Sequence, residues 1–521
     1  MALALLNMSL AFQNLWPTPL IRVTHALSVE AALLVLGLIA ARGRFGAPSR
    51  RVLRTIAIVW VVLIIGRYAD VTAQGLFGRQ INLYWDMRLM PDVGRMLTSV
   101  ASPQLIAAVL GALVFIPLVL YVIVRLALGH VSHAVGEPRA RRAVGVMACV
   151  VLVLFPIQHV EEPFAELPKV AAPVTTTFFH QAGLFVQEAT GLGIPPLAPA
   201  PSIESNLARL GGADVLLVFL ESYGAVSWDQ ERFVKGLVPS RARFEASIRE
   251  TGRQVVSAFV TSPTFGGGSW LAHVNLLSGT EVRDENANLR LMAQKRDTLV
   301  TAFARRGYKT VAIMPGLRAS WPEGAFYGFD DIYGTKRLDY HGPPFGWWDL
   351  TDQFAIARMD EQVVAPGERA PVFVFFPTIS THTPFLPTPP YQPDWDRMLK
   401  SRPYDIEDRE EAWGEQPNWE DLGPGYVKSI AYAFDTIGGY LRLRADRDFV
   451  VVLVGDHQPP ALVTGEGASW DVPVHVIASR PAILGHLRQQ GFQPGLVPRH
   501  PTLGAMHKMM PLLLDAFDEP E

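Results

Sequence analysis

The stretch Val215-Leu-Leu-Val-Phe-Leu-Glu-Ser222 is a short apolar run that ends in a carboxylate. A second stretch of the same kind, Val450-Val-Val-Leu-Val-Gly-Asp-His457, ends in a carboxylate and an imidazole. Continuous β-branched and apolar runs of this length are typical of strands buried in a parallel sheet, where functional side chains gather at the carboxyl ends. We therefore expect Glu221, Asp456 and His457 to lie close together.

A glycine-rich turn supplies a fourth group. In Thr264-Phe-Gly-Gly-Gly-Ser-Trp-Leu-Ala-His273, three glycines precede Ser269, and an apolar run at helical spacing follows. Glycines let the backbone approach a ligand closely, and the free N–H groups at a helix N-terminus favour an anion. Taken alone, the stretch is explained equally by a flexible loop with Ser269 as a helix cap.

Together with the two strands, the turn predicts a divalent-metal site with four ligands: Glu221, Ser269, Asp456 and His457. A cation bound in this way would lower the pKa of the serine hydroxyl. The hydroxyl would then act as a nucleophile at neutral pH.

The stretch Ser269-Trp-Leu-Ala-His-Val-Asn-Leu-Leu-Ser-Gly279 resembles the sulfatase pattern Cys/Ser-x-Pro-Ser-Arg-x-x-Leu-Leu-Thr-Gly. Leu271 replaces the Pro and His273 replaces the Arg, which argues against a formylglycine sulfatase and indicates a direct serine nucleophile. Further segments resemble the lipoteichoic-acid-synthase-like phosphoglycerol transferases of the alkaline-phosphatase/sulfatase superfamily: Leu220-Glu221-Ser222, Gly455-Asp456-His457 and Ser380-Thr-His382-Thr-Pro-Phe385.

This resemblance implies a membrane-anchored transferase that moves a phosphoglycerol or related phospho-head group from a phospholipid through a phospho-serine intermediate. Phosphatidylglycerol is the expected donor, and a periplasmic or cell-envelope glycan is the expected acceptor. Mn²⁺ is the expected metal, with Mg²⁺ and Zn²⁺ as alternatives. His382 lies in a Pro-bounded loop after a strand, so we assign it to substrate binding or to protonation of the leaving group.

Three further residues are candidates for substrate binding. Trp321, in Arg318-Ala-Ser-Trp-Pro-Glu323, resembles the Trp-x-Arg substrate element of the family, although Glu323 stands where the family has Arg. Arg318 is the candidate to reach the same space and to bind phosphate. His273 is the candidate replacement for the sulfatase arginine; packing, one helical turn past Ser269, is the alternative.

The composition predicts a membrane part joined to a large soluble part, because 49% of the 521 residues are hydrophobic and the mean hydropathy is +0.19. A net charge of −3 does not indicate binding to nucleic acid, which needs a positively charged surface. The only cysteine, Cys149, excludes an intramolecular disulfide.

Four apolar stretches are long enough to span a membrane: 20–41, 52–72, 103–127 and 141–160. Met1–Phe12 is either an interfacial helix or a fifth span. We therefore predict a membrane domain over residues 1–160, a proline-punctuated linker over 161–212 and a catalytic domain over 213–521.

Arginine placement predicts the orientation. Basic residues cluster in the first and third loops between the spans: Arg42, Arg44, Arg50, Arg51 and Arg54, then Arg125, Arg139, Arg141 and Arg142. The positive-inside rule places both loops in the cytoplasm, so the chain after residue 160 lies outside. We expect a multi-pass inner-membrane protein with its catalytic domain in the periplasm.

The catalytic part alternates strand-like and helical patterns. Strands are expected at 214–220, 254–260, 309–314, 371–376, 449–454 and 472–477, and helices at 236–250, 297–306, 350–364 and 426–443. Such alternation predicts an α/β domain with a mainly parallel sheet between helices. The resemblance selects the alkaline-phosphatase-like fold among such architectures.

Other functions remain open at this point. A phosphoethanolamine transferase of the same fold is one, although those enzymes usually carry several disulfides and a threonine nucleophile, and this chain has neither. A phosphatase or sulfatase would need a fuller two-metal set. A non-catalytic, membrane-tethered lipid-binding regulator built on the same fold is the alternative from a different class.

Overall fold

The computed structural model describes residues 1–15, 19–77, 81–100, 103–160, 168–191, 196–318, 321, 323–345 and 348–519. The chain divides into two compact units, Met1–Ile194 and Pro195–Glu521. Among these described residues, the first unit has one apolar core, and the second has a core on each face of its sheet. The boundary between the units falls within the predicted linker.

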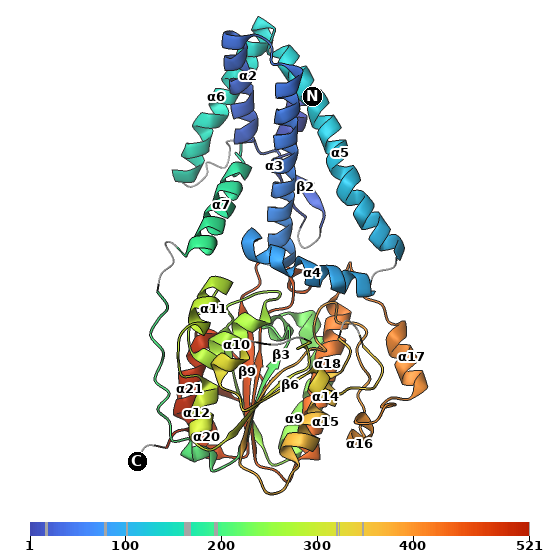
Figure 1. The fold of residues 1–521 in the computed structure, drawn as a ribbon, viewed down its shortest axis with the longest axis vertical. Coiled ribbons are helices and arrows are strands. Elements are labelled where there is room, and N and C mark those ends of the chain that lie inside the picture. Colours follow the sequence, from blue (N-terminus) through green and yellow to red (C-terminus); the bar gives the residue numbers. More distant parts are fainter. Residues whose placement is uncertain are drawn as a thin grey trace. The chain divides into compact units, whose positions relative to one another are not determined.

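The first unit is built of helices and one short hairpin (Figure 1). Its described elements are α1 (Ala2–Met8), β1 (Phe12–Asn14), β2 (Ile21–Val23), α2 (Val29–Phe45), α3 (Arg50–Phe77), α4 (Leu83–Val100), α5 (Pro103–Ala134), α6 (Pro138–Val160) and α7 (Val174–Thr190). Helix α2 packs against α6, and α3 packs against α5 and α7. Leu38, Trp60 and Leu128 are buried where these helices meet.

Three helices of the described residues are long and apolar enough to cross a membrane: Arg50–Gly75, Pro103–Ala134 and Pro138–Gln158. They overlap the predicted spans 52–72, 103–127 and 141–160. The predicted first span, 20–41, differs, because its residues Ile21–Val23 form a strand and α2 begins only at Val29. The 17 residues of α2 extend about 25 Å, which is less than the roughly 30 Å of a hydrocarbon core.

Part of the predicted linker is helical. Helix α7 lies within it and ends at Thr190, and the next residue, Gly191, adopts a left-handed conformation. The start of α7 is fixed to α2, because Glu30 Oε1 accepts a hydrogen bond from the Thr175 N–H at 3.0 Å. Residues 161–167 and 192–195 of the predicted linker lie outside the described residues.

In the described residues, the second unit contains one eight-stranded sheet with the order β10-β4-β9-β8-β3-β7-β5-β6. Its strands are β3 (Asp214–Leu220), β4 (Gln254–Thr261), β5 (Lys309–Met314), β6 (Asp331–Gly334), β7 (Val372–Pro377), β8 (Phe449–Gly455), β9 (Asp471–Ala478) and β10 (Gln493–Pro494). All six predicted strands are present. Because β9 and β10 run opposite to the other six, the sheet is mixed but mainly parallel, as predicted.

Helices cover both faces of this sheet (Figure 1). The helical segments are α8 (Val226–Asp229), α9 (Glu231–Glu250), α10 (Ser269–Ser278), α11 (Glu285–Met292), α12 (Leu299–Arg305), α13 (Gly324–Tyr327), α14 (Thr335–Leu338), α15 (Asp352–Met359), α16 (Trp395–Met398), α17 (Ile406–Gly414), α18 (Gly423–Leu443), α19 (Ala461–Thr464), α20 (Pro481–Gln489) and α21 (Met509–Phe517), with short turns η1 (Ala208–Leu210), η2 (Asp360–Val364) and η3 (Met506–Lys508). Leu216 and Val218 of β3 pack in one core with α9, α15 and α18. Val215 and Leu217 pack in the other with α10, α12, α20 and α21. The predicted α/β architecture is confirmed.

The strand order determines which side chains meet at the edge of the sheet. Strand β3 lies between β7 and β8, although neither is its neighbour along the chain. The register of β3 and β8 pairs Leu220 with Gly455. Since parallel strands end at the same edge, the next residues of the two strands, Glu221 and Asp456, emerge together.

Candidate active site and metal centre

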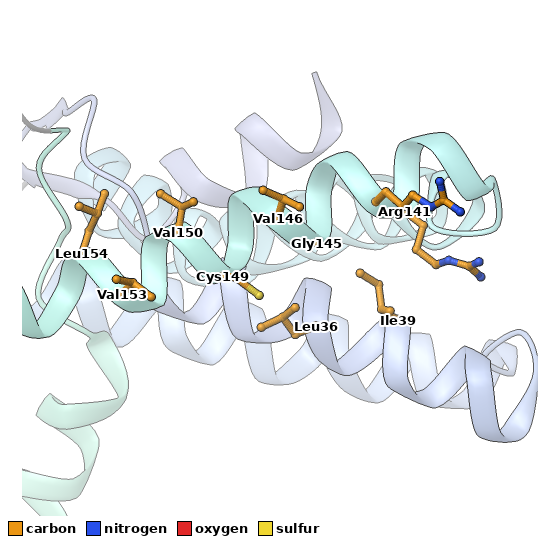
Figure 2. A pocket seen from close by; sticks show the side chains of 10 residues that line it. Leu36, Ile39, Arg141, Gly145, Val146, Cys149, Val150, Val153 and Leu154 are labelled. Carbon is orange, nitrogen blue, oxygen red and sulfur yellow. The ribbon is translucent and has the colours of Figure 1, made fainter.

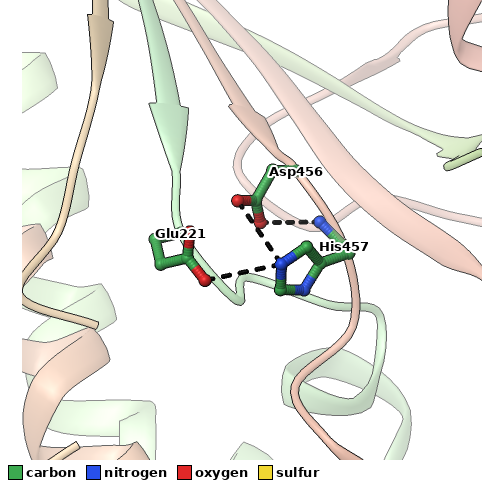
Figure 3. Close-up of side chains that lie close together, drawn as sticks. All are labelled: Glu221, Asp456 and His457. Atoms are coloured by element: carbon green, nitrogen blue, oxygen red, sulfur yellow. Dashed lines mark hydrogen bonds and ion pairs between the residues drawn. The ribbon is translucent and has the colours of Figure 1, made fainter. Parts of the chain in front are cut away.

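Three buried side chains form the candidate metal centre (Figure 3). Glu221 follows β3, and Asp456 and His457 follow β8. One ligand atom of each residue lies within 4.8 Å of the ligand atoms of the other two. His457 Nε2 is 3.4 Å from Glu221 Oε1 and 3.7 Å from Asp456 Oδ2. Two carboxylates and one imidazole are a donor set that divalent cations such as Zn²⁺ and Mn²⁺ accept.

The main chain of Gln458 orients His457. A carbonyl oxygen can only accept, so His457 Nδ1 donates its hydrogen to Gln458 O at 2.7 Å. The neutral ring therefore turns the lone pair of Nε2 toward the two carboxylates. Lone pairs on imidazole and carboxylate repel one another unless a cation or a shared proton lies between them, so this arrangement fits a divalent metal. The same carbonyl accepts the Gly266 N–H at 3.1 Å and thereby fixes the glycine turn to the end of β8.

The protonation of the two carboxyl groups is unequal. Burial raises the pKa of Asp456 well above its ordinary range, and the Glu221 carboxylate adds to the rise. Burial would also raise the pKa of Glu221. The charge that His457 and His382 carry when protonated, together with hydrogen bonds from Asp456 and Ser269, outweighs burial and lowers that pKa to about 2. Burial lowers the pKa of His457, against the opposing effect of Glu221, and so favours the neutral ring. A proton shared by a buried carboxylate pair is one that a bound cation displaces.

Ser269 completes the predicted ligand set. It is the first residue of α10, and its hydroxyl donates to Glu221 Oε2 at 2.8 Å while lying 3.2 Å from His457 Nε2. Gly268, directly before it, has a φ of 74°, in the left-handed region that a residue with a Cβ seldom adopts. The glycine turn thus delivers the hydroxyl to the metal centre, beside the first-turn N–H groups of α10.

Ser222 links the ends of the two strands. Its φ of 57° is left-handed, a conformation that costs a residue with a side chain roughly 1–2 kcal/mol. Its N–H donates to Asp456 Oδ1 at 2.8 Å, and its hydroxyl donates to Glu221 Oε1 at 2.9 Å. One residue therefore orients both carboxylates.

Two threonines after β7 fix the backbone of Glu221, and the sequence analysis missed both roles. The Glu221 N–H donates to Thr378 Oγ1 at 3.0 Å, and the Thr381 hydroxyl donates to the Glu221 carbonyl oxygen at 2.6 Å. The spacing of these residues does not reveal the contacts, because the sequence does not show that β7 lies beside β3.

A buried carboxylate that the sequence analysis missed fixes the loop before His382. Asp352, in the first turn of α15, accepts hydrogen bonds at 2.8 Å from the N–H groups of Ile379 and Ser380. Burial raises the pKa of Asp352 to about 6. The charge of Glu221 adds to this rise, and the hydrogen bonds from the two N–H groups oppose it. The helix-start signal at Thr351, whose side chain caps α15, marks this position in the sequence.

His382 lies close enough to the metal centre for its charge to lower the pKa of both Glu221 and His457. Its Nδ1 faces the Thr383 carbonyl oxygen at 2.7 Å. Nδ1 therefore carries the hydrogen, and proton exchange falls to Nε2. The ring contacts Trp348 edge-on, with 5.9 Å between centroids. A role in substrate binding or proton transfer stays a prediction.

Arg318 and Trp321 lie in different surroundings. Arg318 forms an ion pair with Asp349 at 3.3 Å and lies 5.6 Å from the ring centroid of Trp348, the residue that contacts His382. Trp321 instead stacks on Tyr327, at 5.4 Å between centroids. Phosphate binding by Arg318 and substrate contact by Trp321 stay predictions.

His273 packs between aromatic rings. Its ring centroid lies 4.6 Å from that of Phe219 and 5.4 Å from that of Phe375. Within the described residues its buried Nε2 has no hydrogen-bond partner, and burial lowers its pKa to about 3. The structure thus shows the packing alternative, while substrate contact by His273 stays a prediction.

Solved structures are similar to this chain at low sequence identity. The lipooligosaccharide phosphoethanolamine transferase EptA from Neisseria meningitidis, an integral membrane protein, is 14% identical over 94% of this chain and 87% of its own, with a TM-score of 0.49. The lipoteichoic acid synthase LtaP from Listeria monocytogenes is 14% identical over 53% of this chain and 68% of its own, with a TM-score of 0.38. The phosphoglycerol transferase GacH from Streptococcus pyogenes was solved in complex with sn-glycerol-1-phosphate. It is 13% identical over 51% of this chain and 68% of its own, with a TM-score of 0.33.

A comparison with curated proteins gave no match. The Sulfatase family profile matches residues 214–475, half of the chain, from the first residue of β3 into β9. The matched range includes all four predicted metal ligands. The match confirms the predicted superfamily and the prediction that the protein is an enzyme. The chain belongs to the sulfatase family.

Proposed function

We propose that this chain is a metal-dependent transferase that moves a phosphoglycerol group from phosphatidylglycerol to a cell-envelope glycan through a phospho-serine intermediate. The observation that carries the proposal is the position of the Ser269 hydroxyl, which lies at the N-terminus of α10 and within hydrogen-bond distance of Glu221 and His457. A nucleophile beside anion-binding N–H groups is the arrangement that phosphoryl transfer requires.

Glu221, Asp456 and His457 would hold the metal, together with Ser269 Oγ. Mn²⁺ is the proposed ion, and Mg²⁺ and Zn²⁺ are alternatives that the same donors accept. A bound divalent cation supplies Lewis-acid stabilisation of phosphoryl oxygens and lowers the pKa of the serine hydroxyl.

The reaction then proceeds in two displacements. In the first, the bond between Ser269 Oγ and phosphorus forms as the serine proton passes to water, and the bond from phosphorus to the diacylglycerol oxygen breaks. His382 Nε2 donates a proton to that leaving oxygen. In the second, His382 takes the proton of an acceptor hydroxyl, whose oxygen attacks phosphorus. The bond between phosphorus and Ser269 Oγ breaks, and Oγ regains a proton from water. The N–H groups of the first turn of α10 stabilise the phosphoryl oxygens in both steps.

The donor and the acceptor are proposed from the motif resemblance. Leu220-Glu221-Ser222, Gly455-Asp456-His457 and the segment around His382 are similar to those of phosphoglycerol transferases. Three helices long and apolar enough to cross a membrane support anchoring beside a phospholipid donor. The arginine-rich loops support a multi-pass inner-membrane protein whose catalytic unit lies in the periplasm.

The test uses purified full-length protein in detergent, Mn²⁺ and fluorescent phosphatidylglycerol. Release of fluorescent diacylglycerol is expected from the wild type and not from Ser269→Ala, while the exposed Ser401→Ala in the same unit serves as the control. A parallel reaction with phosphatidylethanolamine distinguishes a phosphoethanolamine transferase. If metal-loaded wild type releases diacylglycerol from neither lipid, the transferase proposal is wrong and a non-catalytic lipid-binding role takes its place.

A further inference from the structure

A groove of about 630 Å³ lies between α2 and α6 of the first unit (Figure 2). Its lining residues are Leu36, Ile39, Arg141, Arg142, Gly145, Val146, Cys149, Val150, Val153 and Leu154. This volume falls within the roughly 300–1,000 Å³ of pockets that hold small molecules. The groove belongs to a different unit of the chain from the Ser269 site.

The lining of the groove follows from the spacing of residues along α6. Residues four apart lie on one face of a helix, so two rows run along this wall: Arg141, Gly145, Cys149, Val153 and Arg142, Val146, Val150, Leu154. Each row begins with an arginine and continues with small or aliphatic side chains. Figure 2 shows Arg141 at one end of the groove and Leu154 at the other.

Small residues create the hollow. A Cβ at Gly145 would lie only 3.3 Å from Ile39 Cδ1, so the glycine permits the close approach of α2 and α6. Further along, Val146 is 65% exposed, Val150 48% and Val153 59%. These side chains offer a continuous aliphatic surface that no residue of the described chain covers fully.

The length of the groove matches one leaflet of a bilayer. Twelve residues separate Arg141 from Val153, a rise of about 18 Å along a helix. Half of the hydrocarbon core of a membrane is about 15 Å thick. An acyl chain that starts at the arginines therefore reaches the far end of the groove.

The charge at the polar end of the groove favours an anion. Within the described residues, neither Arg141 nor Arg142 forms an ion pair, although Glu137 lies one turn before Arg141. Arg42 lies at the same end of the helix pair, but it is engaged with the Ser132 carbonyl oxygen at 3.4 Å. Guanidinium groups at the membrane surface bind phosphate by paired hydrogen bonds and charge.

We propose that the groove binds one anionic phospholipid, with an acyl chain along Gly145, Cys149 and Val153 and the phosphate at Arg141 and Arg142. The positive-inside rule places this end at the cytoplasmic face, so the bound lipid belongs to the inner leaflet. It stabilises the contact between α6 and the short helix α2. The site does not depend on the proposed transferase activity.

The chain carries its own reporter, because Cys149 is its only cysteine and lines the groove. The rate of Cys149 alkylation by N-ethylmaleimide is measured by intact mass on full-length protein in uncharged detergent. Phosphatidylglycerol is compared with phosphatidylcholine that has the same acyl chains. Phosphatidylglycerol is expected to slow alkylation at concentrations where phosphatidylcholine does not.

The variant Arg141→Gln/Arg142→Gln tests head-group binding. It is expected to raise the phosphatidylglycerol concentration needed for protection by about 30-fold, since each arginine near an anionic lipid contributes roughly a fivefold factor. The matched control is Arg44→Gln/Arg139→Gln, which removes the same charge from the same end of the helix pair without altering the lining. The control should keep full protection, which also excludes a general effect of anionic lipid on thiol ionisation.

Three outcomes would overturn the proposal. Equal protection by phosphatidylcholine would mean that any acyl chain fills the groove. Protection that grows with protein concentration in the absence of lipid would mean that a second copy covers α6. Absence of protection would mean that the groove binds no lipid. If the double-arginine variant does not fold, the comparison of the two lipids on the wild type still decides the question.

Discussion

Ser269 Oγ lies 2.8 Å from Glu221 Oε2, although 48 residues separate the two in the chain. The contact joins the first residue of α10 to the end of β3, so the nucleophile and a metal ligand are positioned by different elements. Glu221 is itself fixed by Thr378, Thr381 and Ser222. The serine hydroxyl therefore points to a carboxylate whose backbone and side chain are both restrained.

Glu221→Gln is expected to abolish metal binding and activity together. The amide lacks the negative charge of the carboxylate, and it cannot exchange a proton for a bound cation. Bound Mn²⁺, Mg²⁺ and Zn²⁺ are measured by mass spectrometry on the purified full-length protein, beside diacylglycerol release. Chelation of the wild type should remove activity, and Mn²⁺ should restore it. Glu231→Gln, at an exposed position, is the control. Full metal occupancy in Glu221→Gln would contradict the assignment of this ligand.

His382→Gln is expected to lower kcat by about 10²–10⁴-fold, the usual contribution of a general acid–base group. The loss should be smaller with a donor whose leaving group is a better one, since such a group needs less protonation. His341→Gln, whose side chain is exposed, should retain wild-type kcat. Equal losses for good and poor leaving groups would argue that His382 binds substrate instead.

Gly268→Ala is expected to destabilise the protein and to reduce activity. Its φ of 74° disfavours any Cβ by about 1–2 kcal/mol, and the added atom would lie 3.1 Å from Thr264 Oγ1. Gly252→Ala is a matched control, because Gly252 has a φ of 70° with open space around it and lies in the turn after α9. Both variants should melt at lower temperature, and only Gly268→Ala should lose kcat. Similar kcat in the two variants would show that the glycine turn does not position Ser269.

Asp352→Asn is expected to change how stability depends on pH. The pKa of Asp352 is raised by burial from 3.8 to about 6, so between these values the folded state binds more proton than the unfolded state. The free energy of unfolding therefore falls as pH rises through this window, by about 3 kcal/mol in total. Asn does not titrate and removes this contribution.

The melting temperature of full-length protein in detergent is followed from pH 4 to pH 7 for the wild type and for Asp352→Asn. The melting temperature of the wild type, relative to that of the variant, should be highest at pH 4. This advantage should decrease toward pH 7. Asp339→Asn, at an exposed position, is the control. Parallel curves for the wild type and Asp352→Asn would falsify the assigned pKa.

The sequence predicts the strands of the catalytic unit well where burial is complete. β3 and β5 have the predicted bounds, because each contains an uninterrupted apolar run: six residues after Asp214 in β3 and four residues after Thr310 in β5. The short strands β6 and β10 were missed, since four and two residues at the edges of a sheet carry no such run. The reversed direction of β9 was not predicted either, because a strand buried on both faces has the same pattern in either direction.

The four predicted metal ligands meet in the structure. They could be predicted because strand ends and a helix start leave local signals in the sequence. The groups that support them could not be predicted in the same way. Their supporting roles depend on the position of β7 beside β3, which is a tertiary relationship. These groups are Thr378, Thr381 and Asp352. Helix α7 was assigned to the linker for a similar reason, since its contact between Thr175 and Glu30 is long-range.

The pairing of Leu220 with Gly455 makes the site sensitive to insertions and deletions rather than to exchange of residue types. One residue added within β3 would turn Glu221 to the opposite face of the sheet, because side chains alternate along a strand. Two added residues would restore the face but advance Glu221 by about 6.6 Å past Asp456. The number of residues in β3 and β8 is therefore more constrained than the identity of the aliphatic side chains within them.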